Sequence, residues 1–154
     1  MNSTTLKITR AGVIAALYTA LTVVFSSVAY GPIQFRPSEA LTLLPILFPE
    51  AILGVTVGCI LSNLLSPVGL PDMIFGPLVT LAAAYLTYYF RRSILAYAFP
   101  IVLNGLFVSL YLYKFYKLPY LYNVLTIGGS EAVVVLILGI PLIVYLRKYL
   151  EQHS

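Results

Sequence analysis

Charged side chains are scarce in this chain of 154 residues, in which Asp, Glu, Lys and Arg together make up 9% of the composition. A soluble domain carries about 25% charged residues, because polar side chains must cover its surface. Here 60% of the residues are hydrophobic, which excludes an ordinary soluble fold and a disordered chain. The net charge of +4 contains no basic cluster longer than two residues, which also excludes a nucleic-acid-binding module of the usual kind.

Cysteine and histidine each occur once, and tryptophan is missing. Cys59 is the only cysteine and His153 the only histidine, so neither an intrachain disulfide nor a zinc cage can form. The sequence also lacks a Ser/His/Asp set, a His-Glu-x-x-His motif and the Gly-x-x-x-x-Gly-Lys-Ser/Thr loop that binds ATP. We therefore expect no metal site, no cofactor and no catalytic activity in this chain.

Long uncharged runs are what the sequence does contain. They cover residues 11–35, 51–71, 73–90 and 93–113, and a further run over 127–146 is interrupted only by Glu131. A helix of about 20 apolar residues crosses a bilayer, so these runs predict an all-α, multi-pass protein of the plasma membrane. The shorter run at 40–49 is either half of a broken helix or a sixth, short span.

Charge placement favours six spans over five. With six spans and both termini cytoplasmic, six of the nine basic residues lie on the cytoplasmic side, whereas five spans give five to four at best. We therefore predict a single membrane domain over 1–154, a six-transmembrane-helix bundle with both termini cytoplasmic. Its helices are predicted at about 8–29, 38–49, 50–66, 72–90, 94–114 and 128–147. The alternative for the first run is a cleaved signal peptide, but the run is longer than the roughly 7–15 apolar residues of such peptides.

Three acidic residues fall at equivalent places in this map, because Glu39, Asp72 and Glu131 each open a helix on the outer side. Stabilisation of a helix N-terminus explains each acid singly. It does not explain Arg36 close to Glu39, or Asn104 near mid-depth, since polar groups inside a membrane usually face a cavity or each other. We therefore predict a polar pocket in the outer half of the bundle.

The predicted pocket suits a small, flat, hydrogen-bonding ligand. Carboxylates accept hydrogen bonds from N–H groups, Asn offers a donor and an acceptor, and Phe rings stack on a planar ligand. The candidate substrate-binding residues are Gln34, Phe35, Arg36, Glu39, Asn63, Asp72, Phe75, Asn104 and Glu131. Arg36 is expected to orient Glu39 or to close the site. Membrane proton relays also use Asp and Glu, so an autonomous proton- or ion-coupled carrier stays open as a second interpretation.

Small residues line the first predicted helix at spacings of four. They are Ala11, Gly12, Ala15, Ala16 and Ala20. Rows of this kind let helices approach closely, either inside one protein or against a partner. This face is therefore a candidate docking surface and equally a candidate packing surface.

Residues 30–41, Tyr-Gly-Pro-Ile-Gln-Phe-Arg-Pro-Ser-Glu-Ala-Leu, resemble the signature of the queuosine-precursor transporter (QueT) family. The resemblance continues through Gly58, Asn63, residues 72–76, Asn104, Glu131 and residues 138–142, and so spans nearly the whole chain. It departs at Pro37, where the family has an apolar residue such as Ile, and at Ser130, where the family commonly has Gly.

Members of this family are substrate-binding S components of energy-coupling factor (ECF) transporters. The resemblance implies six helices, a site below the outer loops and a queuosine precursor, a deazaguanine base, as the ligand. One carboxylate would accept the two neighbouring N–H groups of its guanine-like edge, Asn63 and Asn104 would contact the opposite edge, and Phe35 and Phe75 would stack on the ring.

The resemblance also implies partners and a mechanism. The first helix would dock on a transmembrane coupling subunit driven by two ATPase subunits, which use the ATP, and the loaded S component would topple in the membrane to release its substrate inward. The chain would then be a transport subunit and not an enzyme. An S component for another vitamin-like ring compound is the alternative.

Overall fold

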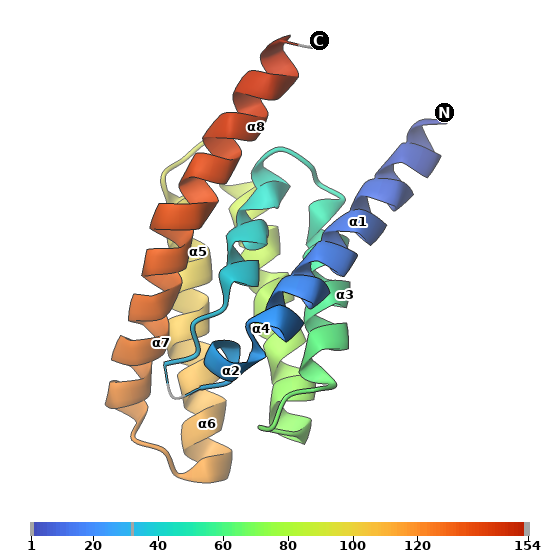
Figure 1. The fold of residues 1–154 in the computed structure, drawn as a ribbon. Helices are drawn as coiled ribbons and strands as arrows, with labels where there is room; N and C mark the ends of the chain where they lie inside the picture. Colours follow the sequence, from blue (N-terminus) through green and yellow to red (C-terminus); the bar gives the residue numbers. More distant parts are fainter. Residues whose placement is uncertain (1, 32, 153–154) are drawn as a thin grey trace.

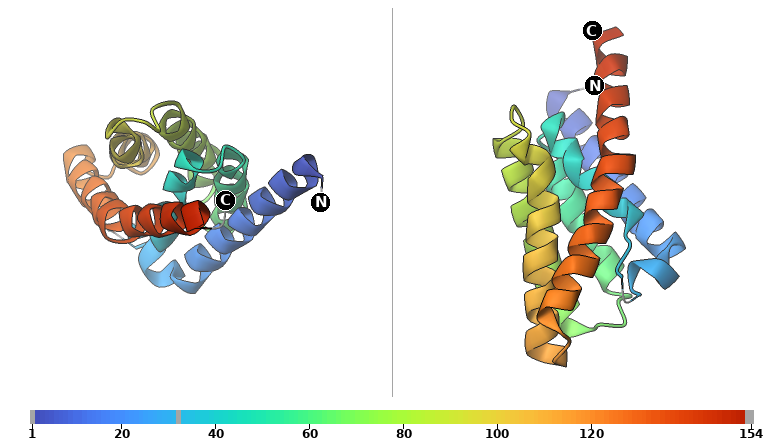
Figure 2. Two further views of the ribbon diagram at one scale, coloured as in Figure 1. Left: turned by 90° about the horizontal axis from the view of Figure 1, so that it is seen from above. Right: turned by 90° about the vertical axis from the view of Figure 1, so that its left-hand side faces the viewer.

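The computed structural model describes residues 2–31 and 33–152, and every regular element in that part of the chain is helical. In chain order the elements are α1 (Ser3–Val24), α2 (Ser26–Ala29), η1 (Pro37–Ile46), α3 (Ala51–Asn63), α4 (Leu70–Tyr89), α5 (Leu95–Leu103), η2 (Asn104–Val108), α6 (Ser109–Tyr116), α7 (Tyr120–Val134), η3 (Val135–Gly139) and α8 (Ile140–Gln152). They form a bundle whose two chain ends lie at the same end, here called the terminal end; the other is the distal end (Figures 1 and 2). The predicted all-α class is confirmed.

Four helices in the described residues are long and apolar enough to cross a membrane. They cover 3–24, 70–89, 95–116 and 120–152. Helix α3 is apolar but shorter, and η1 is a 3-10 helix. Four of the six predicted spans therefore coincide with long helices, whereas those predicted at 38–49 and 50–66 correspond to two short elements.

Helix η1 lies inside the bundle, where it packs against α1, α3, α4, α5, α8 and η3 (Figure 1). All its residues from Ser38 to Ile46 are buried, so it has no face exposed at the surface of the bundle. Pro45 has no N–H to donate, so the helix lacks one backbone hydrogen bond at this position. The hydroxyl of Thr42 donates to the carbonyl oxygen of Glu39 at 2.6 Å. The element ends at Ile46 and not at the predicted residue 49, and it places Glu39 deep in the bundle.

Helices α1 and α3 pack closely because α3 carries two glycines on the side that faces α1. A Cβ added at Gly58 would lie 2.9 Å from the carbonyl oxygen of Ala15 and 2.6 Å from the Cβ of Tyr18. A Cβ added at Gly54 would lie 2.8 Å from the carbonyl oxygen of Ala11. Such distances leave no room for a side chain, so the backbones of the two helices approach directly.

The small residues of α1 therefore divide into two rows. Ala11 and Ala15 lie on the side that packs against α3, and Ala15 is buried. Gly12, Ala16 and Ala20 are exposed. The sequence alone did not separate a packing row from an exposed row.

The last long helix begins at Tyr120 and not at the predicted residue 128. Lys117 adopts a left-handed backbone conformation, with φ 56°, and ends α6. Pro119 then precedes the first turn of α7. Glu131 consequently lies in the interior of α7, and the prediction that it opens a helix is wrong.

Replacing Gly58 by Ala tests the α1–α3 contact. The new methyl group would overlap the backbone of α1, so we expect the melting temperature of the purified protein in detergent to fall by several degrees, equivalent to about 1–3 kcal/mol. The matched control is Gly12→Ala, because a Cβ added there meets nothing within 4 Å. Equal melting temperatures for the two variants would contradict this description of the interface.

Candidate functional site

A small cavity lies where η1, η2 and α7 meet the segment that precedes η1. Its lining residues are Gln34, Arg36, Glu39, Asn104, Val108, Ile127 and Glu131. The structure thus brings together five of the nine residues that the sequence predicted. The cavity has a volume of about 10 Å³, which is room for about one water molecule.

Glu39 is held from one side only. The Tyr18 hydroxyl of α1 donates to its Oε1 atom at 2.5 Å, and both side chains are buried. Its Oε2 atom is also buried and has no hydrogen-bond partner among the described residues. One acceptor of this carboxylate is therefore fixed by the fold and the other is available.

Asn104 and Glu131 face the same cavity from the opposite side of the bundle. The Nδ2 atom of Asn104 and the Oε1 atom of Glu131 are buried without a hydrogen-bond partner in the described part of the chain. Leaving a buried polar group unpaired costs about 1–3 kcal/mol. Two acceptors and one donor around one cavity, counting Oε2 of Glu39, are the arrangement expected of a site that a polar ligand completes.

Arg36 lines the cavity and also belongs to a second group of polar side chains, which includes Asp72 and Asn63. Its Nη2 atom donates to Oδ2 of Asp72 at 3.2 Å, and both side chains are buried. Its Nε atom donates to the carbonyl oxygen of Ala29 at 3.2 Å, and its guanidinium lies over the ring of Tyr30, 5.1 Å from the centroid. Arg36 therefore pairs with Asp72 and not with Glu39, the carboxylate that the sequence analysis expected it to orient.

Asp72 and Asn63 are occupied by protein partners. The Tyr111 hydroxyl donates to Oδ1 of Asp72 at 2.6 Å, so both carboxylate oxygens have a donor. The Asn63 amide donates to the carbonyl oxygen of Asp72 at 2.9 Å and accepts from Arg36 at 3.5 Å. Neither residue lines the cavity, and both accept hydrogen bonds from Arg36.

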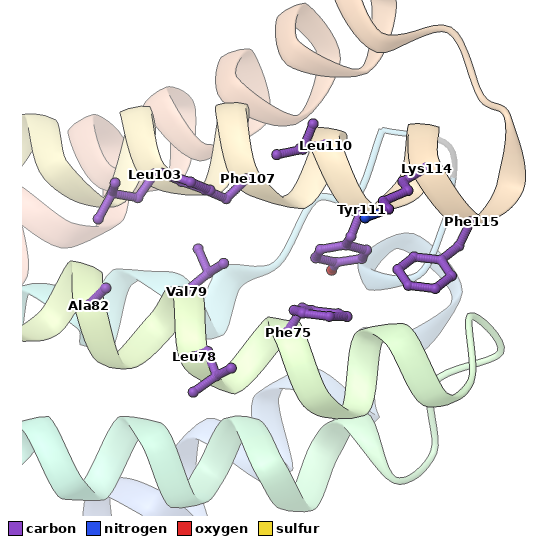
Figure 3. Close-up of a pocket in the computed structure, with 10 residues that line it drawn as sticks. All are labelled: Phe75, Leu78, Val79, Ala82, Leu103, Phe107, Leu110, Tyr111, Lys114 and Phe115. Carbon is purple, nitrogen blue, oxygen red and sulfur yellow. The ribbon is translucent and has the colours of Figure 1, made fainter.

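The two predicted stacking residues also lie outside the cavity lining. Phe75 stacks on Tyr111, with ring centroids 5.9 Å apart, and faces a groove of about 440 Å³ between α4 and the α5–α6 helix (Figure 3). Apart from Lys114 and the Tyr111 hydroxyl, that groove is lined by apolar side chains. Phe35 is half-buried, and its backbone N–H donates to the carbonyl oxygen of Val28 at 3.1 Å.

Residues 33–36 form part of the cavity wall and contact α7 through Ser130. The Ser130 hydroxyl lies 2.9 Å from the carbonyl oxygen of Ile33 and 3.4 Å from that of Gln34. Gln34 has φ 50°, a left-handed conformation that is unusual for a residue other than glycine. Ser130, one of the departures from the family pattern, thus connects this segment to the helix that carries Glu131.

Two tyrosines of the site escaped the sequence analysis. One is Tyr111, which lies near the end of the run predicted at 94–114 and whose hydroxyl donates to Asp72. The other is Tyr18, which had a detectable signal, because tyrosine prefers the interfaces and this residue lies near the middle of the span predicted at 8–29.

A metal ion finds no ligand set in residues 2–31 and 33–152, where no three His, Cys, Asp or Glu side chains form a group that could hold one. His153, which the sequence analysis set aside as a ligand, lies outside the described residues.

Comparisons with known proteins identify relatives of the chain. Residues 8–148 match the model of the family described as QueT transporter. A stretch of 81 residues is 43% identical to the queuosine precursor transporter QueT of Lactococcus lactis subsp. cremoris (strain MG1363), and the match covers 51% of this chain and 47% of that protein, about half of its length. No solved structure matches the chain. Both names describe transporters and not enzymes, and the long apolar helices fit a multi-pass membrane protein.

The buried ion pair gives a prediction about stability. Asp72→Asn leaves the Arg36 charge buried without a counterion, so we expect the free energy of unfolding to fall by about 3–5 kcal/mol, measured by thermal unfolding in detergent. Glu50→Gln is the matched control, because Glu50 also accepts from an arginine at 3.2 Å, but the Arg10 side chain is 40% exposed. That change should cost about 1 kcal/mol or less. Similar losses in the two variants would show that Arg36 does not depend on Asp72.

Proposed function

The chain belongs to the QueT transporter family, and we propose that it is the substrate-binding S component of an ECF transporter that takes up a queuosine precursor. The observation that carries this proposal is the set of unpaired buried atoms around the cavity, on Glu39, Asn104 and Glu131. A deazaguanine base presents neighbouring N–H donors and a ring carbonyl acceptor, which complement two carboxylates and an amide N–H group.

Glu131 is the carboxylate that we assign to the guanine-like edge. Its Oε1 atom is buried and has no hydrogen-bond partner among the described residues, so this oxygen is available to an N–H donor of the ligand. Asn104, on the facing helix, offers its Nδ2 donor to the ring carbonyl. The alternative carboxylate, Asp72, already has a donor on each oxygen.

Substrate entry requires the cavity to enlarge, because a volume of about 10 Å³ holds one water molecule and not a bicyclic base. Segment 33–36 is the part of the wall that we propose moves. It is irregular, Ile33 is exposed, and side-chain contacts of Ser130 hold it against α7. The site lies toward the distal end of the bundle (Figure 1).

The proposed topology has six spans with both termini in the cytoplasm. It is supported by the elements that carry basic residues: the first half of α1 has Lys7 and Arg10, the α4–α5 connection has Arg91 and Arg92, and the second half of α8 has Arg147 and Lys148. These parts of α1 and α8 and the α4–α5 connection lie at the terminal end of the bundle (Figure 1). Positive residues are retained on the cytoplasmic side of a membrane. The distal end then faces outward, so substrate would enter from outside.

Docking on the coupling subunit is proposed to use the exposed row of α1. This row consists of Gly12, Ala16 and Ala20, whose small, exposed side chains allow another helix to approach closely. The partners would be the transmembrane coupling subunit and two ATPase subunits that use ATP, and toppling of the loaded S component would release the substrate inward. The sequence itself has no P-loop for ATP.

Substitution of Glu131 tests the proposed function. Isothermal calorimetry with a queuine-type base should show ATP-independent binding to the purified chain, and Glu131→Gln should weaken it by about 10–100-fold, because one of two charge-assisted hydrogen bonds is lost. Glu50→Gln, at the terminal end, should bind as tightly as the unchanged protein. An absence of heat with the unchanged protein would refute the ligand assignment.

Added bulk on α1 tests docking separately from binding. Ala16→Leu should abolish uptake in cells that contain the coupling subunit and the ATPases, and should leave the calorimetric affinity unchanged. The control is Ala82→Leu, which adds the same bulk at an exposed alanine of α4. Ala15 is unsuitable because it is buried. If uptake persists in Ala16→Leu, this row is not the docking surface. Uptake by the chain alone in liposomes would instead establish an autonomous carrier.

A further inference from the structure

Three arginines from two distant parts of the chain meet at the terminal end of the bundle. Arg91 and Arg92 belong to the α4–α5 connection, and Arg147 belongs to α8 (Figure 1). Their side chains line one cleft of about 490 Å³, here called the arginine cleft, whose other lining residues are Ser93, Ile94 and Tyr97. The cleft is separate from the polar cavity, with which it shares no lining residue.

The arginine cleft carries a positive net charge. Its three uncharged lining residues supply no counterion, and the two ion pairs of the described residues lie elsewhere, one on α1 and one in the distal half. Glu151 follows Arg147 by one turn of α8, and the net charge stays positive with this acid counted. Retention on one side of a membrane explains the presence of basic residues, but it does not require that arginines of two segments share a cleft.

The donors of the cleft suit a phosphate group. The guanidinium of Arg91 lies over the Tyr88 ring, 4.4 Å from the centroid, and its Nη1 atom donates to the Tyr88 carbonyl oxygen at 3.2 Å. This contact orients the side chain, and the remaining N–H groups of its five can bind a ligand. Guanidinium groups bind phosphate oxygens through paired hydrogen bonds, and the hydroxyl groups of Ser93 and Tyr97 can donate to the same anion.

The surroundings of the cleft favour the phosphate of a lipid over a dissolved phosphate. Ile94, in the lining, is 82% exposed, and Tyr89 of α4 and Tyr145 of α8 are each 67% exposed. Both tyrosines lie on helices long and apolar enough to cross a membrane, and exposed tyrosines near the ends of such helices mark the level of the lipid head groups. An amphiphile contacts the arginines and the apolar side chains together, whereas inorganic phosphate uses the arginines alone.

We propose that the arginine cleft binds the phosphate of an anionic phospholipid from the leaflet at the terminal end. Basic clefts between membrane-crossing helices are suited to such head groups. This inference goes beyond the proposed function, because the cleft does not contact the cavity and the substrate plays no part in it. A phosphate held by Arg92 and Arg147 together links α8 to the α4–α5 connection, so bound lipid stabilises the terminal half of the bundle.

Native mass spectrometry of the purified full chain in detergent tests the site. Phosphatidylglycerol should bind at least about 10-fold more tightly than phosphatidylcholine with the same acyl chains, and Arg92→Gln combined with Arg147→Gln should weaken its binding by about 10–30-fold. The matched control is Lys7→Gln combined with Lys148→Gln, which removes the same charge at the same end but outside the cleft lining. All four side chains are exposed, so both double variants should fold, and the control should bind as tightly as the unchanged protein.

Three results would overturn the proposal. Equal losses in the two double variants would show that general attraction between charges, and not the cleft, explains the preference. Equal affinities of the unchanged protein for the two lipids would show that the head-group charge is not recognised. Inorganic phosphate added at the same concentration should leave phosphatidylglycerol bound, and its displacement would assign the cleft to a dissolved phosphate. None of these measurements uses a queuine-type base, so their outcome is independent of the proposed function.

Discussion

The buried ion pair between Arg36 and Asp72 fixes the distal half of the bundle. It joins the residue before η1 to the first turn of α4, and the Tyr111 hydroxyl attaches α6 to the same carboxylate. After Glu39, helix η1 is apolar apart from Thr42, so packing alone would give it little preference for one depth over another. Because the charges must stay together inside the protein, the pair determines that depth and thereby the position of Glu39.

This network also explains why the polar groups of the bundle fall into two classes. Those that connect η1 to α3, α4 and α6 satisfy one another. The buried side-chain atoms without a partner in the described residues belong to Glu39, Asn104, Ser109, Asn123 and Glu131, and all but Glu39 lie on the η2-to-α7 side. Polar groups that satisfy one another thus lie beside groups with free hydrogen-bonding capacity, which is the division expected where a ligand is bound.

Much of this arrangement was predictable from the sequence, because scarce polar residues in an apolar chain have few possible uses. Five of the residues that line the observed cavity were candidates from their position in the sequence. Its place on the outer side of a membrane stays a prediction. The partner of Arg36 did not: Glu39 is three residues away, whereas Asp72 is on another helix. In 3-10 and α-helical segments of unknown relative rotation, nearness in sequence does not determine which carboxylate an arginine meets.

The start of the last long helix was missed for a related reason. The charged residues 114 and 117 end one uncharged run, and the stretch from Pro119 to the next uncharged run was expected to be a loop. In the structure this stretch, which contains two tyrosines and Asn123, is helical, so α7 begins two turns before the predicted residue 128. Gly105 and Gly128 then face each other, and a Cβ added at Gly105 would lie 3.2 Å from the Cα of Gly128. This close approach, beside the π-helical turn that begins at Asn104, places Asn104 and Glu131 on the same cavity. Since such turns add a residue without ending the helix, they re-aim side chains in ways that helical periodicity does not reveal. Asn104 and Glu131 are therefore positioned by backbone contacts at glycines, and the charges alone determine only which groups must be buried together.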